Sequence, residues 1–130
     1  MQIDSATLYV FVKELKQLMA GAQVRQIHQI DNRIMDIELF CPSAKPVHLI
    51  CNTHTPPVVY ISTKGKKQNQ YAPSQTFCMT LRKHLEGSRL SHVEQIEMDR
   101  ILAFSFDRIE AGGAIVTKTL WAELLPASPN

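Results

Sequence analysis

Apolar residues recur at helical spacing in two stretches of the chain. The first stripe consists of Leu8, Phe11, Val12, Leu15, Leu18 and Met19, and the second of Phe77, Cys78, Leu81 and Leu85. Residues three and four apart share one face of a helix, so these stripes predict helices over residues 5–20 and about 75–86. Capping and stop residues flank both stripes: Asp4 or Ser5 and Gly21 around the first, Ser74 and Gly87 around the second.

Alternation of apolar and polar residues predicts seven strands. Four fall between the helices, over residues 22–30, 33–40, 47–52 and 58–62, and three follow the second helix, over about 89–98, 101–107 and 114–125. In the second strand Met35, Ile37 and Leu39 point to one side. Asp36 and Glu38 point to the other side, so this strand is expected to be buried on one face and solvated on the other.

The two strands nearest the end of the chain show the same alternation. Leu102, Phe104 and Phe106 are expected to point inward from the first. The inward set of the second is Val116, Leu120, Ala122 and Leu124, against Lys118 and Glu123 on the other face. Because the strands follow one another as hairpins rather than through helices, the pattern predicts an α+β fold, with an antiparallel β-sandwich or barrel-like sheet and two helices.

Short polar pairs mark two of the turns. Asp31-Asn32 suits a tight hairpin turn. Asp99-Arg100 falls where a two-residue turn would join strands 89–98 and 101–107, but Gly or Asn is favoured at the second central position. Binding is therefore a candidate reason for Arg100, because a guanidinium can clamp a phosphate with two hydrogen bonds or stack on a base.

Composition indicates one folded domain. The chain has 130 residues, of which 45% are apolar and 20% charged, enough to bury a core without staples. Three cysteines without a CxxC pair argue against a disulfide-rich secreted scaffold. No apolar run is long enough for a signal peptide or a membrane span, which favours a cytoplasmic protein with no membrane partner.

Positive charge is concentrated in one segment. Residues 64–90 hold six basic side chains and one acidic side chain, a net charge of +5 in a chain whose total is +2. The basic residues are Lys64, Lys66, Lys67, Arg82, Lys83 and Arg89. Two interpretations stay open. The segment is either a solvated loop with a helix end, where cations interact favourably with the helix dipole, or a set of phosphate contacts on one surface.

Motifs for catalysis and metal binding are missing from the sequence. It holds no Walker loop, GxGxxG, HExxH or GxSxG. The five His residues have no metal-ligand spacing, so neither a metal nor a cofactor is expected. Cys51 and His54 lie close in sequence, but no carboxylate or second base is placed to activate the thiol. We therefore do not expect an enzyme.

The stretch FCMTLRKHLEGSRLSHVEQIEMDRI, residues 77–101, resembles the N-terminal domain of the NFACT family, also described as fibronectin-binding protein A-like and, in bacteria, as RqcH. The family shows Phe-Cys-Met, Leu-Arg-Lys-His-Leu-Glu-Gly and Asp-Arg-Ile in this order. The opening helix followed by GAQVRQIHQIDN is also similar to the family's start, so the resemblance covers essentially all 130 residues.

Family proteins are several times longer than this chain. We therefore expect residues 1–130 to form the N-terminal part of an NFACT N-terminal domain, within a longer multidomain protein. The chain departs from the family at its end, where a Gly-Arg-His-Ser-Asn-like segment is usual. PASPN keeps only Ser128 and Asn130, so no role of that Arg or His is carried over.

The resemblance implies a role in ribosome-associated quality control. Family proteins bind a large ribosomal subunit that still holds peptidyl-tRNA, recruit aminoacyl-tRNA (alanyl-tRNA in bacteria) and support template-free C-terminal tailing of the stalled chain. The family's Asp-Arg pair is tied to tRNA engagement, a role that carries onto Asp99 and Arg100. The basic residues of the segment 64–90 would add phosphate contacts, and no DNA partner is expected.

Two other functions remain as alternatives. The older family name suggests a fibronectin-binding surface adhesin, against which the missing export signal argues. The family domain is also similar in fold to the N-terminal domain of formamidopyrimidine-DNA glycosylases. Those enzymes use an N-terminal Pro amine and an adjacent Glu, whereas Gln2 and Ile3 follow Met1 here, so glycosylase catalysis is not expected.

Overall fold

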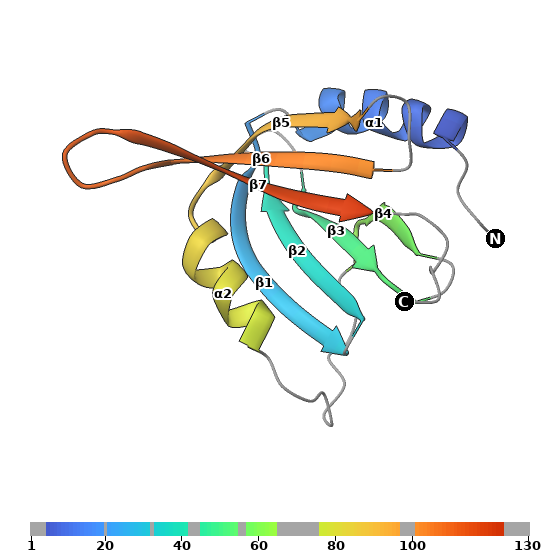
Figure 1. Cartoon of the computed structure of the whole chain (residues 1–130), viewed down its shortest axis with the longest axis horizontal. Coiled ribbons are helices and arrows are strands. Elements are labelled where there is room, and N and C mark those ends of the chain that lie inside the picture. The colour runs from blue at the N-terminus through green and yellow to red at the C-terminus, as the bar shows by residue number, and fades with distance from the viewer. Residues whose placement is uncertain are drawn as a thin grey trace.

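In the part of the chain that the structure describes, seven antiparallel strands form one sheet, accompanied by two helices (Figure 1). The computed structural model describes residues 5–19, 21–31, 33–41, 45–54, 57–64, 76–96 and 101–123. The elements are α1 Ser5–Met19, β1 Gln23–Asp31, β2 Ile34–Phe40, β3 Val47–Asn52, β4 Val58–Ser62, α2 Thr76–Leu85, β5 Arg89–Gln95, β6 Ile101–Ile109 and β7 Ile115–Glu123. The α+β class, both helices and the existence of all seven strands are confirmed.

The sheet curls so that its last strand lies over its first half. Its strand order is β4-β3-β2-β1-β5-β6-β7, so β4 and β7 are the two edges. Figure 1 shows β7 passing across β2 and β3, while the β6–β7 hairpin projects beyond the rest of the sheet. α1 packs on β5 and α2 on β1, so each helix covers a different half of the curled sheet.

The core lies inside this curl and contains most of the residues expected there. Val12 and Leu15 of α1 are 4% and 0% exposed, and both belong to the main buried cluster. The inward residues of β6 are equally enclosed, as are those of α2: Leu102, Phe104 and Phe106, with Cys78, Leu81 and Leu85. The side chains of Leu8, Leu18, Met19 and Phe77, and residue Leu124, lie outside the described part of the chain.

The edge of β1 away from β2 is shared between β5 and α2. β1 pairs with β5 only where Gln23 lies opposite Arg89. Beyond that point the backbone N–H of Gly87 donates to the Val24 carbonyl at 2.9 Å. Gly87 ends α2 with φ +84°, a conformation that glycine adopts without the penalty of a Cβ. The loop after α2 thus fills part of the gap in the sheet.

One side chain of α2 and one from the residue directly after it complete the same edge. The guanidinium Nε of Arg82 donates to the Ile27 carbonyl at 2.7 Å, and the Ile27 N–H donates to a carboxylate oxygen of Glu86 at 3.1 Å. Backbone groups buried without partners cost free energy, so this pair stabilises the edge where no strand is paired. The fold therefore fixes the orientation of α2 and of the basic residues at its end.

Two expectations about individual residues were wrong. Asp36, expected on a solvated face, is 2% exposed, because it lies beside His48 and the fully buried Ile50 of β3. Lys118, expected to face outward, lies on the inward face of β7, since it shares its alternation with Val116 and Leu120. Its ammonium is accommodated there by a contact with His84 of α2.

The turn predicted at Asp99-Arg100 lies outside the described residues. Within the described part of the chain, β5 ends at Gln95 rather than at residue 98, and Gln95 pairs with Leu102 of β6. The two-residue turn and the role of Arg100 therefore stay predictions.

Candidate nucleic-acid interface

Four basic residues lie at the C-terminal end of α2, and we refer to them as the helix-end cluster: Lys83, His84, Arg108 and Lys118. Arg108 of β6 donates from Nη1 to the Lys83 carbonyl at 3.0 Å and from Nη2 to the Glu86 carbonyl. The Lys118 ammonium contacts Nδ1 of His84. The strands of the β6–β7 hairpin thus bring two cations against the helix end.

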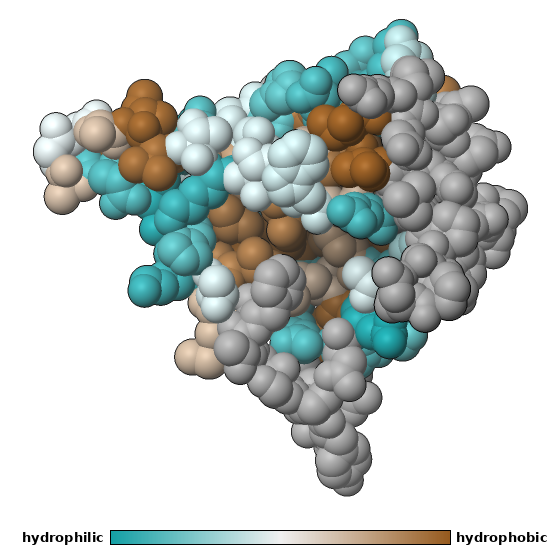
Figure 2. Space-filling view, in the orientation of Figure 1, coloured by the Kyte–Doolittle hydropathy of each residue, from teal (hydrophilic) through white to brown (hydrophobic). Residues whose placement is uncertain are grey.

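In the helix-end cluster one cation bonds the protein backbone and another is exposed to solvent. The last carbonyls of a helix have no partner within it and carry the negative end of its dipole, so the Arg108 guanidinium caps α2. Lys83 is exposed on the same turn of the helix. Figure 2 shows polar side chains gathered where the β6–β7 hairpin passes α2. The structure thus places two cations, Arg108 and Lys118, beside the turn of α2 that carries the exposed Lys83.

Arg82, next to this cluster in sequence, is engaged differently. Its Nε holds the backbone of β1, and the side chain is partly buried. This contact gives Arg82 a structural role that the sequence did not suggest. Its predicted contact with phosphate stays a prediction.

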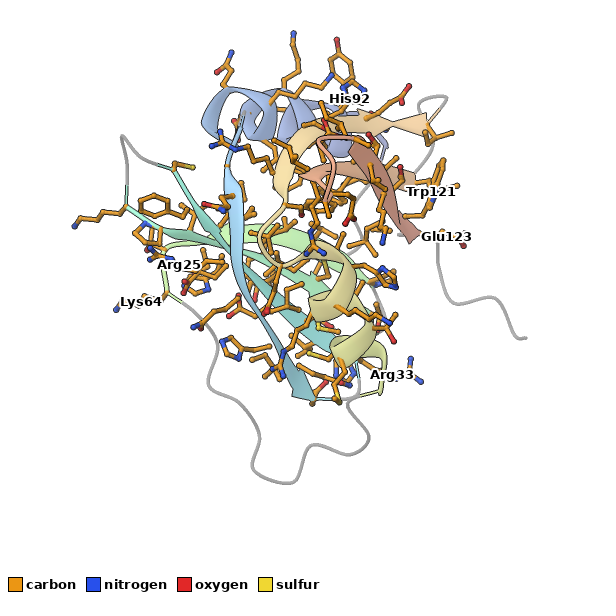
Figure 3. The ribbon with its side chains drawn as sticks, turned by 90° about the vertical axis from the view of Figure 1, so that its left-hand side faces the viewer. Arg25, Arg33, Lys64, His92, Trp121 and Glu123 are labelled. Atoms are coloured by element: carbon orange, nitrogen blue, oxygen red, sulfur yellow. The ribbon has the colours of Figure 1, made fainter. Side chains whose placement is uncertain are left out.

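Two of the other predicted phosphate contacts, Lys64 and Arg89, lie on different parts of the sheet. Lys64 follows the edge strand β4, whereas α2 packs on β1, and Figure 3 shows Lys64 away from α2. Arg89 is exposed at the start of β5, opposite Asp107 of β6. Lys66 and Lys67, like Asp99 and Arg100, lie outside the described residues.

Two residues of the helix-end cluster were missed by the sequence analysis. Arg108 and Lys118 fall in residues 91–130, where acidic side chains are in excess, so local charge gave no signal for them. The inward position of Lys118 could have been recognised from the sequence, because the alternation along β7 places Lys118 on the same face as Leu120. The meeting of Arg108 and Lys118 with α2 depends on the curl of the sheet and has no signature in the sequence.

His48 of β3 lies between two carboxylates of β2, those of Asp36 and Glu38. Nδ1 of His48 is 2.8 Å from Asp36 Oδ1, and its Nε2 is 3.8 Å from Glu38 Oε2. This arrangement explains how Asp36 is buried, because a buried carboxylate needs a hydrogen-bonded or charged partner. Among the described residues, however, no group of three or more His, Cys, Asp or Glu is placed to hold a metal ion.

Cys51 and His54 are close in sequence but lie in different environments. Burial, and secondarily the negative charge of Asp36, raises the pKa of the Cys51 thiol to about 12. The thiol therefore stays protonated at neutral pH, whereas a nucleophilic cysteine needs its thiolate. His54 is exposed, and its Nε2 lies 3.3 Å from Asp31 Oδ2. None of the described helices is long and apolar enough to cross a membrane.

Comparison with known proteins decides the family. The model of the NFACT N-terminal and middle domains matches residues 4–130. The chain belongs to the NFACT family. The Rqc2 homolog RqcH of Bacillus subtilis is 28% identical over 131 residues, which cover 100% of this chain and 22% of that protein. A ribosome quality control complex subunit NEMF homolog of Drosophila melanogaster is 33% identical over 106 residues, 81% of this chain and 10% of that protein.

Solved structures share the NFACT fold seen here. The N-terminal part of the fibronectin/fibrinogen-binding protein of Streptococcus suis superimposes with a TM-score of 0.85 at 23% identity, over 96% of this chain and 46% of that one. The N-terminal domain of the fibronectin-binding protein PavA of Streptococcus pneumoniae gives 0.83 at 22% identity, over 95% and 46%. This chain thus spans less than half of those structures and about a fifth of the bacterial RqcH relative.

Proposed function

We propose that this NFACT chain binds tRNA and contributes to ribosome-associated quality control without catalysing a reaction itself. The observation that carries the proposal is the helix-end cluster, where Lys83, Arg108 and Lys118 come together from one helix and two strands. Grouped cations contact phosphates and release counterions from the nucleic acid. Membership of a family whose relatives include RqcH and NEMF makes RNA of the translation apparatus the favoured partner.

The finer parts of this function follow from the family resemblance. In the cytoplasm, the domain would act on a large ribosomal subunit that holds peptidyl-tRNA and would help to recruit alanyl-tRNA in bacteria. It would thereby support template-free C-terminal tailing of the stalled chain. Asp99 and Arg100 would contact the tRNA, with the cations of residues 64–90 adding phosphate contacts. The likeness to the glycosylase N-terminal fold stays a prediction that accompanies this one.

A salt titration of tRNA binding tests the role of the cluster. The logarithm of the binding constant falls with the logarithm of salt concentration by about 0.7–0.9 per phosphate contact. Lys83→Glu should lower this slope by about one and weaken binding several-fold at low salt. Lys16→Glu makes the same charge change on the exposed face of α1 and serves as the matched control. Equal slopes for both variants and the wild-type chain would refute the assignment of the cluster to RNA.

The Asp-Arg pair needs a test of tailing itself. Asp99→Ala with Arg100→Ala, placed in a full-length family protein that carries this chain as its N-terminal part, should abolish alanine tailing and weaken tRNA binding while the fold is retained. Circular dichroism of the variant chain controls for unfolding. Unchanged tailing by a folded variant would remove both residues from the proposed site.

The adhesin alternative predicts a different partner. The solved relatives carry fibronectin or fibrinogen binding in their names, but at 22–23% identity they show the fold alone. If the chain binds RNA and is not an adhesin, immobilised fibronectin should capture both this chain and its Lys83→Glu variant only at background level. Saturable fibronectin binding, together with surface labelling of the protein on intact cells, would favour the adhesin.

A further inference from the structure

An apolar cavity of about 290 Å³ opens between the two edges of the curled sheet. Its floor comes from β2 and β3, and its walls come from β4, from α2 and from β7. The apolar lining includes Met35, Ile37, Val59, Leu81, Leu120 and Ala122. Figure 2 shows this apolar hollow in the middle of the face that carries β7. The volume is at the lower end of the range of about 300–1,000 Å³ that is usual for ligand sites, which suits one inserted side chain.

A buried hydrogen-bond acceptor lies in the wall of this cavity. Gln29 lines it and is only 6% exposed. Among the described residues, the Gln29 Oε1 atom has no hydrogen-bond partner. Leaving such an atom unpaired costs about 1–3 kcal/mol. The Oε1 atom itself is fully buried, so an occupant that brings an N–H into the cavity would remove this penalty once the Gln29 side chain turns toward it, whereas a purely apolar occupant would not.

The mouth of the cavity is bordered by unpaired strand edges and by an exposed tryptophan. Within the described part of the chain, β4 and β7 each pair on one side only, and both contribute to the lining. Trp121 of β7 is 58% exposed and borders the cavity (Figure 3). Free strand edges accept additional strands, and exposed tryptophans are typical anchors of protein interfaces.

Charge at the mouth favours a polypeptide over a nucleic acid. Asp31 and Glu123 border the cavity with one guanidinium, that of Arg33. The hydrogen bond from the Arg33 N–H lowers the pKa of Asp31, so its carboxylate is ionised at neutral pH. The net charge of these three side chains is negative, which repels phosphate and attracts a basic side chain.

We propose that this cavity is a docking site for an extended polypeptide segment that inserts an apolar side chain, donates a backbone N–H to Gln29 and places a basic residue near Asp31 and Glu123. The segment comes from the part of an NFACT protein that this chain does not cover, which is more than half of the solved N-terminal part of the protein from Streptococcus suis. In longer relatives this part belongs to the same polypeptide. The docking surface adjoins the helix-end cluster, because Leu120 in its lining lies two residues from Lys118 on the same face of β7, but the proposal does not depend on RNA binding.

Trp121 provides a direct probe, because it is the one tryptophan of the chain. Overlapping synthetic peptides that cover the unmatched part of the Streptococcus suis structure are titrated against the 130-residue chain while Trp121 emission is recorded. At least one peptide with an apolar residue beside a basic one should shift the emission to shorter wavelength in a saturable manner. The same part of the domain, fused to the chain, should reduce acrylamide quenching of Trp121, because a tether raises the effective concentration.

Two charge-introducing variants locate the docking segment. Ala122 is half-buried and lines the cavity, so Ala122→Glu should weaken peptide binding at least tenfold. Thr119→Glu adds the same charge to an exposed position of the same strand and should leave binding unchanged. Circular dichroism verifies that both variants are folded.

Three results would overturn the proposal. One is that none of the peptides shifts the Trp121 emission and that acrylamide quenching of Trp121 is the same in the fused chain as in the chain alone. Another is an emission shift that follows the concentration of the chain alone, because it would identify a second copy as the occupant. The third is a shift with tRNA and with no peptide, because it would assign the cavity to RNA.

Discussion

Arg82 and Lys83 are adjacent in sequence, yet the structure predicts opposite consequences for their loss. Arg82 Nε donates to the Ile27 carbonyl at 2.7 Å in a partly buried setting. A hydrogen bond from a charged donor contributes about 1.5–3 kcal/mol. After Arg82→Ala the Ile27 carbonyl keeps only the thiol of Cys78 at 3.7 Å, a weak donor. The expected loss in the free energy of unfolding is therefore about 2 kcal/mol.

For a chain of this size that loss lowers Tm by about 8 °C, at about 4 °C per kcal/mol. Arg82→Lys should lose a similar amount, because an ammonium group cannot reproduce the fixed geometry of Nε. Lys83→Ala, at an exposed position, should change the free energy of unfolding by no more than about 0.5 kcal/mol. It should instead reduce the salt slope of tRNA binding by about one.

Two assays on the same preparations separate these effects. Urea unfolding, followed by circular dichroism, gives the free energy of unfolding, and fluorescence anisotropy of labelled tRNA over a salt series gives the slope. The reasoning is refuted if Arg82→Ala is as stable as the wild-type chain but lowers the slope by one. In that case Arg82 would be a phosphate contact, and its bond to Ile27 would have no energetic weight.

Three further predictions concern the turn after α2, one carboxylate and one thiol. Gly87→Ala should lower the free energy of unfolding, as measured by thermal denaturation, by about 1 kcal/mol. This cost comes from the φ of +84° alone, because no atom lies within 4 Å of the position that the added Cβ would take. The pKa of Asp31 is lowered chiefly by the Arg33 N–H, so its contribution to stability is present above its unfolded pKa near 3.8 and is lost as pH falls through the lower folded value. Asp31→Asn should therefore flatten the fall of stability below about pH 4, as measured by acid unfolding. The Cys51 pKa of about 12 predicts that its alkylation by iodoacetamide in the folded chain rises without a plateau up to pH 10, and a plateau below pH 9 would contradict it.

The residues that form the helix-end cluster show the limit of reading charge along a chain. Lys83 lies in a segment of net charge +5, so its basic surroundings were visible. Arg108 lies 25 residues from Lys83, in a segment with more acidic than basic side chains. The two are neighbours because β6 carries Arg108 past the end of α2. The charge of neighbouring residues in the sequence therefore could not predict that contact.

Asp99 and Arg100 were singled out on two independent grounds. The pair lies between two alternating patterns, which suggested a two-residue turn, and the unusual arginine then suggested a binding role. Both residues lie outside the described part of the chain, so the turn stays a prediction. The second ground is the family motif, and the match of the family model to residues 4–130 supports the assignment of the chain to that family.

The sequence by itself determined the helices, the strands and most of the core of this protein. Helical and strand periodicities depend on near neighbours, so Leu15 and Phe104 could be placed in the core without knowledge of the fold. The order of the strands and the curl of the sheet were decided by tertiary structure. They bring Lys118 to His84 across 34 residues and leave a cavity between β4 and β7. Such contacts depend on how the faces of distant elements pack, and neither periodicity nor composition encodes that packing locally.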